Sequence, residues 1–193
     1  MPKSALSLEV AELFYGICND LYMRWKIYRH LFDDNVDQNK LQFGDGARCL
    51  DDIGRYMHGS VLLELCKLHD PIVQSDRVNL TIGYVVDLGG WEPGVRTELL
   101  GLKKEMESLF GKIKLARNKL IAHNDLQTIL EGTVLGQFKK DADIQYFRNL
   151  ERFVGVIFRE LTGRPRPFYD LVTNEAEAFR QVLLRGWNVV PDE

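Results

Sequence analysis

Apolar residues recur every three or four positions along much of the chain. The first run extends from Leu8 to Phe32. Its apolar positions are Val10, Phe14, Ile17, Leu21, Trp25, Tyr28 and Phe32. A second run with the same period begins near Ala47 and continues to about His69, where Pro71 ends it. Because a helix places such positions on one face, the pattern predicts two long helices, each with one buried stripe.

Three further helices are predicted in the second half of the chain. The third begins near Arg96, the fourth spans about residues 142–161, and the fifth runs from about Asn174 to Arg185. In the fifth, Asn174 is expected to be the N-cap, with Glu177 three residues later. The apolar positions of the third helix are Leu102, Met106, Leu109, Ile113, Ala116 and Leu120, and those of the fifth are Phe179, Val182 and Leu183.

The segment "NLTIGYVVDLGGWEPG", residues 79–94, does not indicate one structure. Its β-branched run followed by Gly-Gly and Glu-Pro-Gly is compatible with a short strand, a helical turn or an ordered loop. We interpret it as a connector between the second and third helices.

Together these elements predict an all-α fold, in which four main helices form a bundle and a C-terminal helix is added. The chain has 193 residues, 45% of them hydrophobic, so it can bury a sizeable core. We expect a single domain over residues 1–193, with its core at about 5–161 and a C-terminal extension at 162–193.

Charge and cysteine content narrow the functional classes only slightly. The formal net charge of -3 excludes a global positive field, so any contact with nucleic acid would depend on a local patch. The three cysteines have unrelated spacings, which is typical of free thiols in a reducing cytosol. No signal peptide or membrane-spanning run is recognisable. We therefore expect a cytoplasmic protein without a membrane partner.

The stretch "KLARNKLIAHND", Lys114 to Asp125, places charged groups on a face that should be buried. On a helical wheel with Ala116 at zero, Arg117 lies at about 100°, inside the apolar arc, and His123 at about -20°, on its edge. The two residues are about 120° apart around the axis and about 9 Å apart along it. A shared site therefore needs the reach of the Arg side chain, a helix that ends near His123, or a second subunit.

These residue types suit phosphate chemistry. An imidazole with a pKa of about 6.5 exchanges protons at neutral pH, and a guanidinium binds phosphate through two parallel hydrogen bonds. Asn118 could orient the same group, while Lys114 and Lys119 add local positive charge. On spacing alone, however, an Arg and a His near a helix end more often form a C-terminal cap or an ion pair.

Other candidate chemistry is weaker. Cys66 and His69 have the spacing of half a zinc site, with His58 upstream, but no second pair follows, so a core role is favoured and no metal or cofactor is expected. Arginines recur in the C-terminal third, where a solvated helix face is the favoured explanation over an RNA contact. They are Arg148, Arg152, Arg159, Arg164 and Arg166.

The motif "RNKLIAHND" at the end of a bundle helix resembles the defining motif of the HEPN superfamily. The chain is most similar to the AbiU-type abortive-infection HEPN proteins, through "SVLLELCKLHDP" and "NLTI" before the motif helix. The resemblance implies a metal-independent ribonuclease that works as a homodimer on RNA, with Arg117 and His123 as the catalytic pair and Asn118 as a polar helper. It implies a toxin, for which an antitoxin protein could exist. The alternative is a non-catalytic dimeric HEPN module that binds RNA, a nucleotide or a protein partner.

Overall fold

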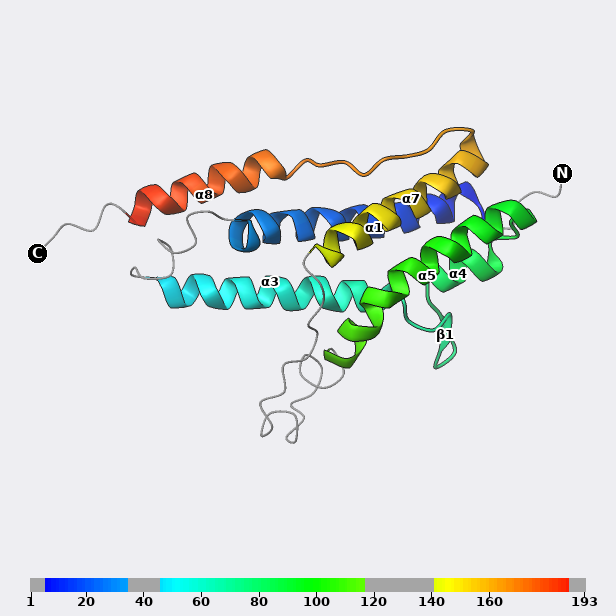
Figure 1. Cartoon of the computed structure of the whole chain (residues 1–193), viewed down its shortest axis with the longest axis horizontal. Coiled ribbons are helices and arrows are strands. Elements are labelled where there is room, and N and C mark those ends of the chain that lie inside the picture. Colours follow the sequence, from blue (N-terminus) through cyan, green and yellow to red (C-terminus); the bar gives the residue numbers. More distant parts are fainter. Residues whose placement is uncertain (1–5, 35–45, 117–140, 188–193) are drawn as a thin grey trace, which may run out of the picture. The chain divides into compact units, whose positions relative to one another are not determined.

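The computed structural model describes residues 6–34, 46–116 and 141–187, and within them the regular secondary structure is helical apart from one small hairpin (Figure 1). The prediction of an all-α fold is confirmed. The helices are α1 (Leu8–Tyr28), the π-helix η1 (Arg29–Asp33), α3 (Ala47–Lys67), α4 (Ile82–Leu88), α5 (Pro93–Ala116), α7 (Ala142–Thr162) and α8 (Thr173–Trp187). The strands β1 (Val73–Gln74) and β2 (Arg77–Val78) pair antiparallel.

The first, second and fourth predicted helices are confirmed as α1 with η1, α3 and α7. Ser7 begins α1, because its hydroxyl accepts a hydrogen bond from the backbone N–H of Val10 at 3.2 Å. Gly163 ends α7 in the left-handed conformation, with φ of 79°, and its N–H donates to the carbonyl of Arg159 at 2.9 Å. This is the helix ending for which glycine is favoured.

Of the three alternatives left open for the connector at residues 79–94, the helical one agrees with the structure, because the segment contains the short helix α4. Thr81 caps this helix: its hydroxyl accepts from the N–H of Tyr84 at 3.1 Å. Trp91 then folds back and donates from its indole Nε1 to the carbonyl of Val85 at 2.6 Å. A Cβ at Gly89 would lie 2.2 Å from that indole nitrogen, so the turn needs glycine there.

The described residues form two compact units, of which the first combines the chain up to Asn19 with Leu62–Phe168. In this unit α5 and α7 lie side by side and antiparallel (Figure 1), and Glu98 near the start of α5 pairs with Arg159 near the end of α7 at 2.6 Å. Their shared core consists of buried residues, among them Leu102, Met106, Leu109, Ile113, Phe147, Leu150, Phe153 and Ile157. From α1, Phe14 packs on Phe153 with ring centroids 6.0 Å apart.

The second unit combines residues from Asp20–Val61 and from Tyr169 onward. Here α8 packs against η1, and Lys26 pairs with Asp170 at 3.3 Å. The expected Asn174 cap is wrong, because α8 already begins at Thr173, whose N–H donates to the Asp170 carboxylate at 3.0 Å. Two of the apolar residues on this helix, Phe179 and Val182, are exposed. The single domain expected over the whole chain stays a prediction.

The three cysteines differ in their surroundings. Cys18 and Cys66 are fully buried in the first unit, where burial raises the pKa of the Cys18 thiol. Cys49, near the start of α3, is exposed. All three are free thiols.

Candidate functional site

The predicted site residues follow directly on α5, whose last residue is Ala116. Arg117, Asn118, Lys119 and His123 lie outside the described residues. Lys114 is described: its side chain is exposed, with its ammonium nitrogen 5.9 Å from the centre of the Phe110 ring. The structure therefore shows how α5 packs as far as Ala116, the residue before the motif.

The apolar face of α5 agrees with the wheel drawn from the sequence. Leu109 and Ile113 are buried and Phe110 is half-buried, so the arc assigned to the core is correct over these turns. Phe110 faces His69, just after α3, and the helix packs along α7. The wheel assigned the Arg117 position to the same arc, and that position lies outside the described residues.

A cluster of three rings from three parts of the chain holds the last turns of α5. His69, just after α3, stacks on Phe110 with ring centroids 4.3 Å apart and an interplanar angle of 10°. Its Nε2 atom lies 2.9 Å from the hydroxyl of Tyr146, near the start of α7. Tyr146 is almost fully buried. The His69 side chain thus links the end of α3 to both helices at the point where α5 leads into the motif.

The spacing of Cys66 and His69 predicts a core role for His69 but not this cluster. Its partner Tyr146 is 77 positions away along the chain, and nothing local marks the two residues as neighbours. Cys66 and His69 have the spacing of half a zinc site. Among residues 6–34, 46–116 and 141–187, however, no three His, Cys, Asp or Glu side chains lie close enough together to bind a metal ion. The other described candidate, His58, stacks on Tyr28 at 5.1 Å.

The pKa of His69 is lowered from 6.5 to about 4, chiefly by burial and secondarily by the positive charge of Lys103. At neutral pH the imidazole is therefore uncharged. A neutral ring can accept a hydrogen bond from the Tyr146 hydroxyl on Nε2 or donate one to it, whereas an imidazolium could only donate and would carry a charge in a buried site. The surroundings of His69 therefore favour its neutral form.

We expect the stability of the fold to fall between about pH 7 and about pH 4 partly because of His69. The unfolded chain binds a proton at this residue below a pH of about 6.5, whereas the folded chain resists it until about pH 4. The stabilisation present above pH 6.5 is thus lost on acidification, by about 3 kcal/mol in total. Urea unfolding of the wild type and of His69→Gln across this range should show the smaller pH dependence in the variant.

His58 provides the matched control for that experiment. Burial also lowers its pKa, although the Asp33 carboxylate opposes the effect. His58→Gln should therefore remove a smaller part of the pH dependence than His69→Gln. Equal slopes for wild type and His69→Gln would contradict the assignment of a neutral, buried imidazole.

These features define an all-α, HEPN-like fold, in which an Arg-to-His motif follows a helix clamped between its neighbours. A family model of the HEPN class, described as AbiU2, matches residues 7–182. The chain therefore belongs to the AbiU2 family of HEPN proteins, and the resemblance found in the sequence is confirmed. The name of this family links the chain to abortive infection.

Two other comparisons add no relatives. Neither the curated proteins nor the solved structures contain a match to this chain. Within the described part of the chain, no helix is both long enough and apolar enough to cross a membrane.

Proposed function

We propose that the chain is a metal-independent endoribonuclease that cleaves single-stranded RNA in the cytosol, as the toxin of a toxin–antitoxin or phage abortive-infection system. The observation that supports this most is the family match, which extends over residues 7–182 and so includes the motif from Arg117 to His123. Arg117 and His123 are the proposed catalytic residues, Asn118 is the polar helper, and Lys114 and Lys119 contact the RNA backbone.

The proposed reaction uses the substrate's own 2'-hydroxyl as nucleophile. His123 acts as general base or acid while the 2'-oxygen bonds to the adjacent phosphorus and the bond from phosphorus to the 5'-oxygen breaks. The proton leaves the 2'-hydroxyl, and the departing 5'-oxygen takes one up. The Arg117 guanidinium meets the negative charge that develops on the phosphate oxygens. The products are a 2',3'-cyclic phosphate and a 5'-hydroxyl.

The proposed active form is a homodimer. The helical wheel drawn from the sequence separates Arg117 from His123 by about 120° and about 9 Å, so a single motif would not bring them together. Two copies of the motif facing each other would gather two Arg and two His side chains into one cleft. Burying the apolar face around Arg117 in such an interface also removes it from water. Light scattering should report a dimer at micromolar concentration, and a stable monomer there would contradict the composite site.

The decisive experiment compares substrates and conditions rather than variants. Purified protein should cleave single-stranded RNA in the presence of EDTA and leave DNA of the same sequence intact, because DNA lacks the attacking hydroxyl. The RNA fragments should end in 2',3'-cyclic phosphate and 5'-hydroxyl groups, which mass spectrometry distinguishes from 3'-hydroxyl and 5'-phosphate ends. Inhibition by EDTA, or equal cleavage of DNA, would show that the mechanism is wrong.

The alternative function is a non-catalytic dimeric module that binds RNA, a nucleotide or a protein partner through the same helix face. It shares the family and the motif with the first proposal. Binding of RNA without any cleavage, by a protein shown to be folded, would favour it.

A further inference from the structure

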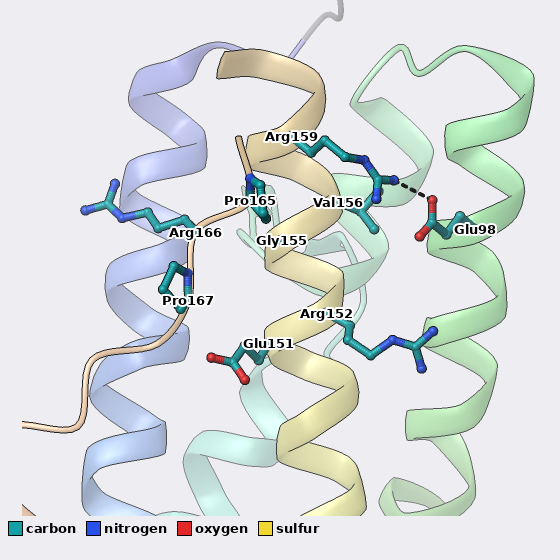
Figure 2. A pocket seen from close by; sticks show the side chains of 9 residues that line it. All are labelled: Glu98, Glu151, Arg152, Gly155, Val156, Arg159, Pro165, Arg166 and Pro167. Carbon is teal, nitrogen blue, oxygen red and sulfur yellow. Dashed lines mark hydrogen bonds and ion pairs between the residues drawn. The ribbon is translucent and has the colours of Figure 1, made fainter. Parts of the chain in front are cut away.

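A groove with a volume of about 520 Å³ lies on the face of α7 between α5 and the segment that follows α7 (Figure 2). Its floor is hollow because Gly155, in the middle of the helix, has no side chain, and Val156 beside it is buried. Pro165 and Pro167 form one wall of the groove. A Cβ added at Gly155 would lie 3.6 Å from the Cβ of Pro165. The floor and this wall offer mainly apolar surface.

The proline wall is fixed by contacts on its far side. In Figure 2 the Arg166 side chain points away from the groove, where it pairs with Glu12 and lies 4.0 Å from the centre of the Tyr15 ring. The Tyr15 hydroxyl donates to the carbonyl of Pro167 at 3.1 Å. At the end of the wall, the N–H of Phe168 donates to Glu151 at 2.8 Å. The groove is thus formed before any ligand enters it.

One cation of the groove has no partner within the described part of the chain. Arg159 pairs with Glu98 at 2.6 Å, and Glu151 accepts the Phe168 N–H. Arg152 is exposed, and its guanidinium makes no hydrogen bond or ion pair with any residue that the structure describes (Figure 2). A spare guanidinium beside a mainly apolar hollow favours a ligand with an apolar group and an anionic group side by side.

We propose that this groove binds an extended peptide segment of a protein partner, with an apolar side chain over Gly155 and an Asp or Glu carboxylate on Arg152. The two positions are three residues apart on α7, which is about 4.5 Å along the helix axis. Alternate side chains on one face of an extended peptide are about 6.6 Å apart, and the long Arg side chain spans the difference. The expected ligand motif is an apolar and an acidic residue within two positions of each other.

Charge favours a peptide here over RNA. Glu98 and Glu151 both line the groove, so a run of phosphates would meet two carboxylates as well as Arg152. A peptide needs to place only one carboxylate, and its apolar side chain gains from the floor and the prolines.

The groove is also distant from the end of α5, after which the motif begins in the sequence. Glu98, at its edge, precedes the end of α5 at Ala116 by 18 residues, or about 27 Å of helix. Binding of a partner here and cleavage of RNA are therefore separable functions, and this proposal goes beyond the proposed ribonuclease.

A random heptapeptide display library, selected on the full chain, tests the proposal. Library members that bind the wild type should be counter-selected on Gly155→Leu, whose side chain fills the hollow. The retained peptides should share an acidic residue within two positions of an apolar one. Binding of a synthetic consensus peptide, measured by NMR, should perturb the amide of Gly155 and weaken at least about tenfold in Arg152→Gln, as expected for loss of a charge-assisted contact.

Two matched variants act as controls. Gly155→Ala should retain binding, because its Cβ would make only an ordinary contact with Pro165. Arg164→Gln removes an exposed Arg close in sequence that does not line the groove, and should also retain binding. Arg152→Gln changes an exposed side chain, so it reports on the groove even if Gly155→Leu disturbs the fold.

Three outcomes would overturn the proposal. The first is that no peptide family distinguishes wild type from Gly155→Leu and Arg152→Gln. The second is that the retained peptides lack an acidic residue. The third is that a DNA oligonucleotide, which the proposed ribonuclease cannot cut, loses affinity in Arg152→Gln while the peptides do not, which would make the groove a nucleic-acid contact. None of these depends on whether the chain cleaves RNA.

Discussion

His123→Ala is expected to lower the rate of RNA cleavage by about 10²- to 10⁴-fold, the range that a positioned general acid or base contributes. The variant loses the one group in the motif that can exchange protons at neutral pH. RNA binding should persist, because the guanidinium and the lysines remain. Cleavage rates on a fluorescent single-stranded RNA, together with affinity for a DNA oligonucleotide that cannot be cut, measure the two effects separately.

His30→Ala is the control for this substitution. His30 lies in η1, in the second compact unit, and has no proposed part in the reaction. The His30→Ala variant should cleave RNA at the wild-type rate. If His123→Ala also cleaved at that rate, His123 would not be a catalytic residue, and the non-catalytic module would become the better description.

Arg117→Lys should reduce cleavage by about 10²- to 10³-fold although the positive charge is kept. An ammonium is a point donor, whereas the planar guanidinium holds two phosphate oxygens at once. Because that contact strengthens as charge develops on the phosphate, the loss should appear mainly in kcat and much less in KM. Steady-state kinetics on the same RNA substrate provide both values.

Arg164→Lys makes the same chemical change at an exposed position after α7. It should leave both kinetic constants unchanged. A kcat for Arg117→Lys within about twofold of the wild type would mean that charge alone is needed at this position, and would contradict two-pronged binding.

The long helices could be predicted from the sequence because each has several turns over which the apolar period repeats. The helix α4 could not, because its seven residues make fewer than two full turns and its boundary depends on the Thr81 hydroxyl. The sequence also predicts the wrong start for α8, because it indicates Asn174 as the cap, whereas the Asp170 carboxylate, three residues before Thr173, accepts the N–H of Thr173. Local patterns thus gave the helices, and single side-chain contacts decided their ends.

The candidate site divides in a similar way. Arg117 and His123 could be proposed from the sequence because the motif is contiguous and its residue types suit phosphate. The cluster of His69, Phe110 and Tyr146 could not, because it forms only when three separate helical segments pack. The hollow at Gly155 was likewise invisible, since a glycine inside a helical pattern indicates a groove only when its neighbours are known.

The unequal exposure of the three thiols makes the unaltered chain suitable for site-directed spectroscopy. Thiolates react with maleimides and methanethiosulfonates, and burial suppresses that reaction at Cys18 and Cys66 while leaving Cys49 open to it. A spin label would therefore attach at one position per subunit without any mutation. In a dimer the two labels would form a single pair, so one dipolar distance from pulsed electron resonance would report on the assembly directly.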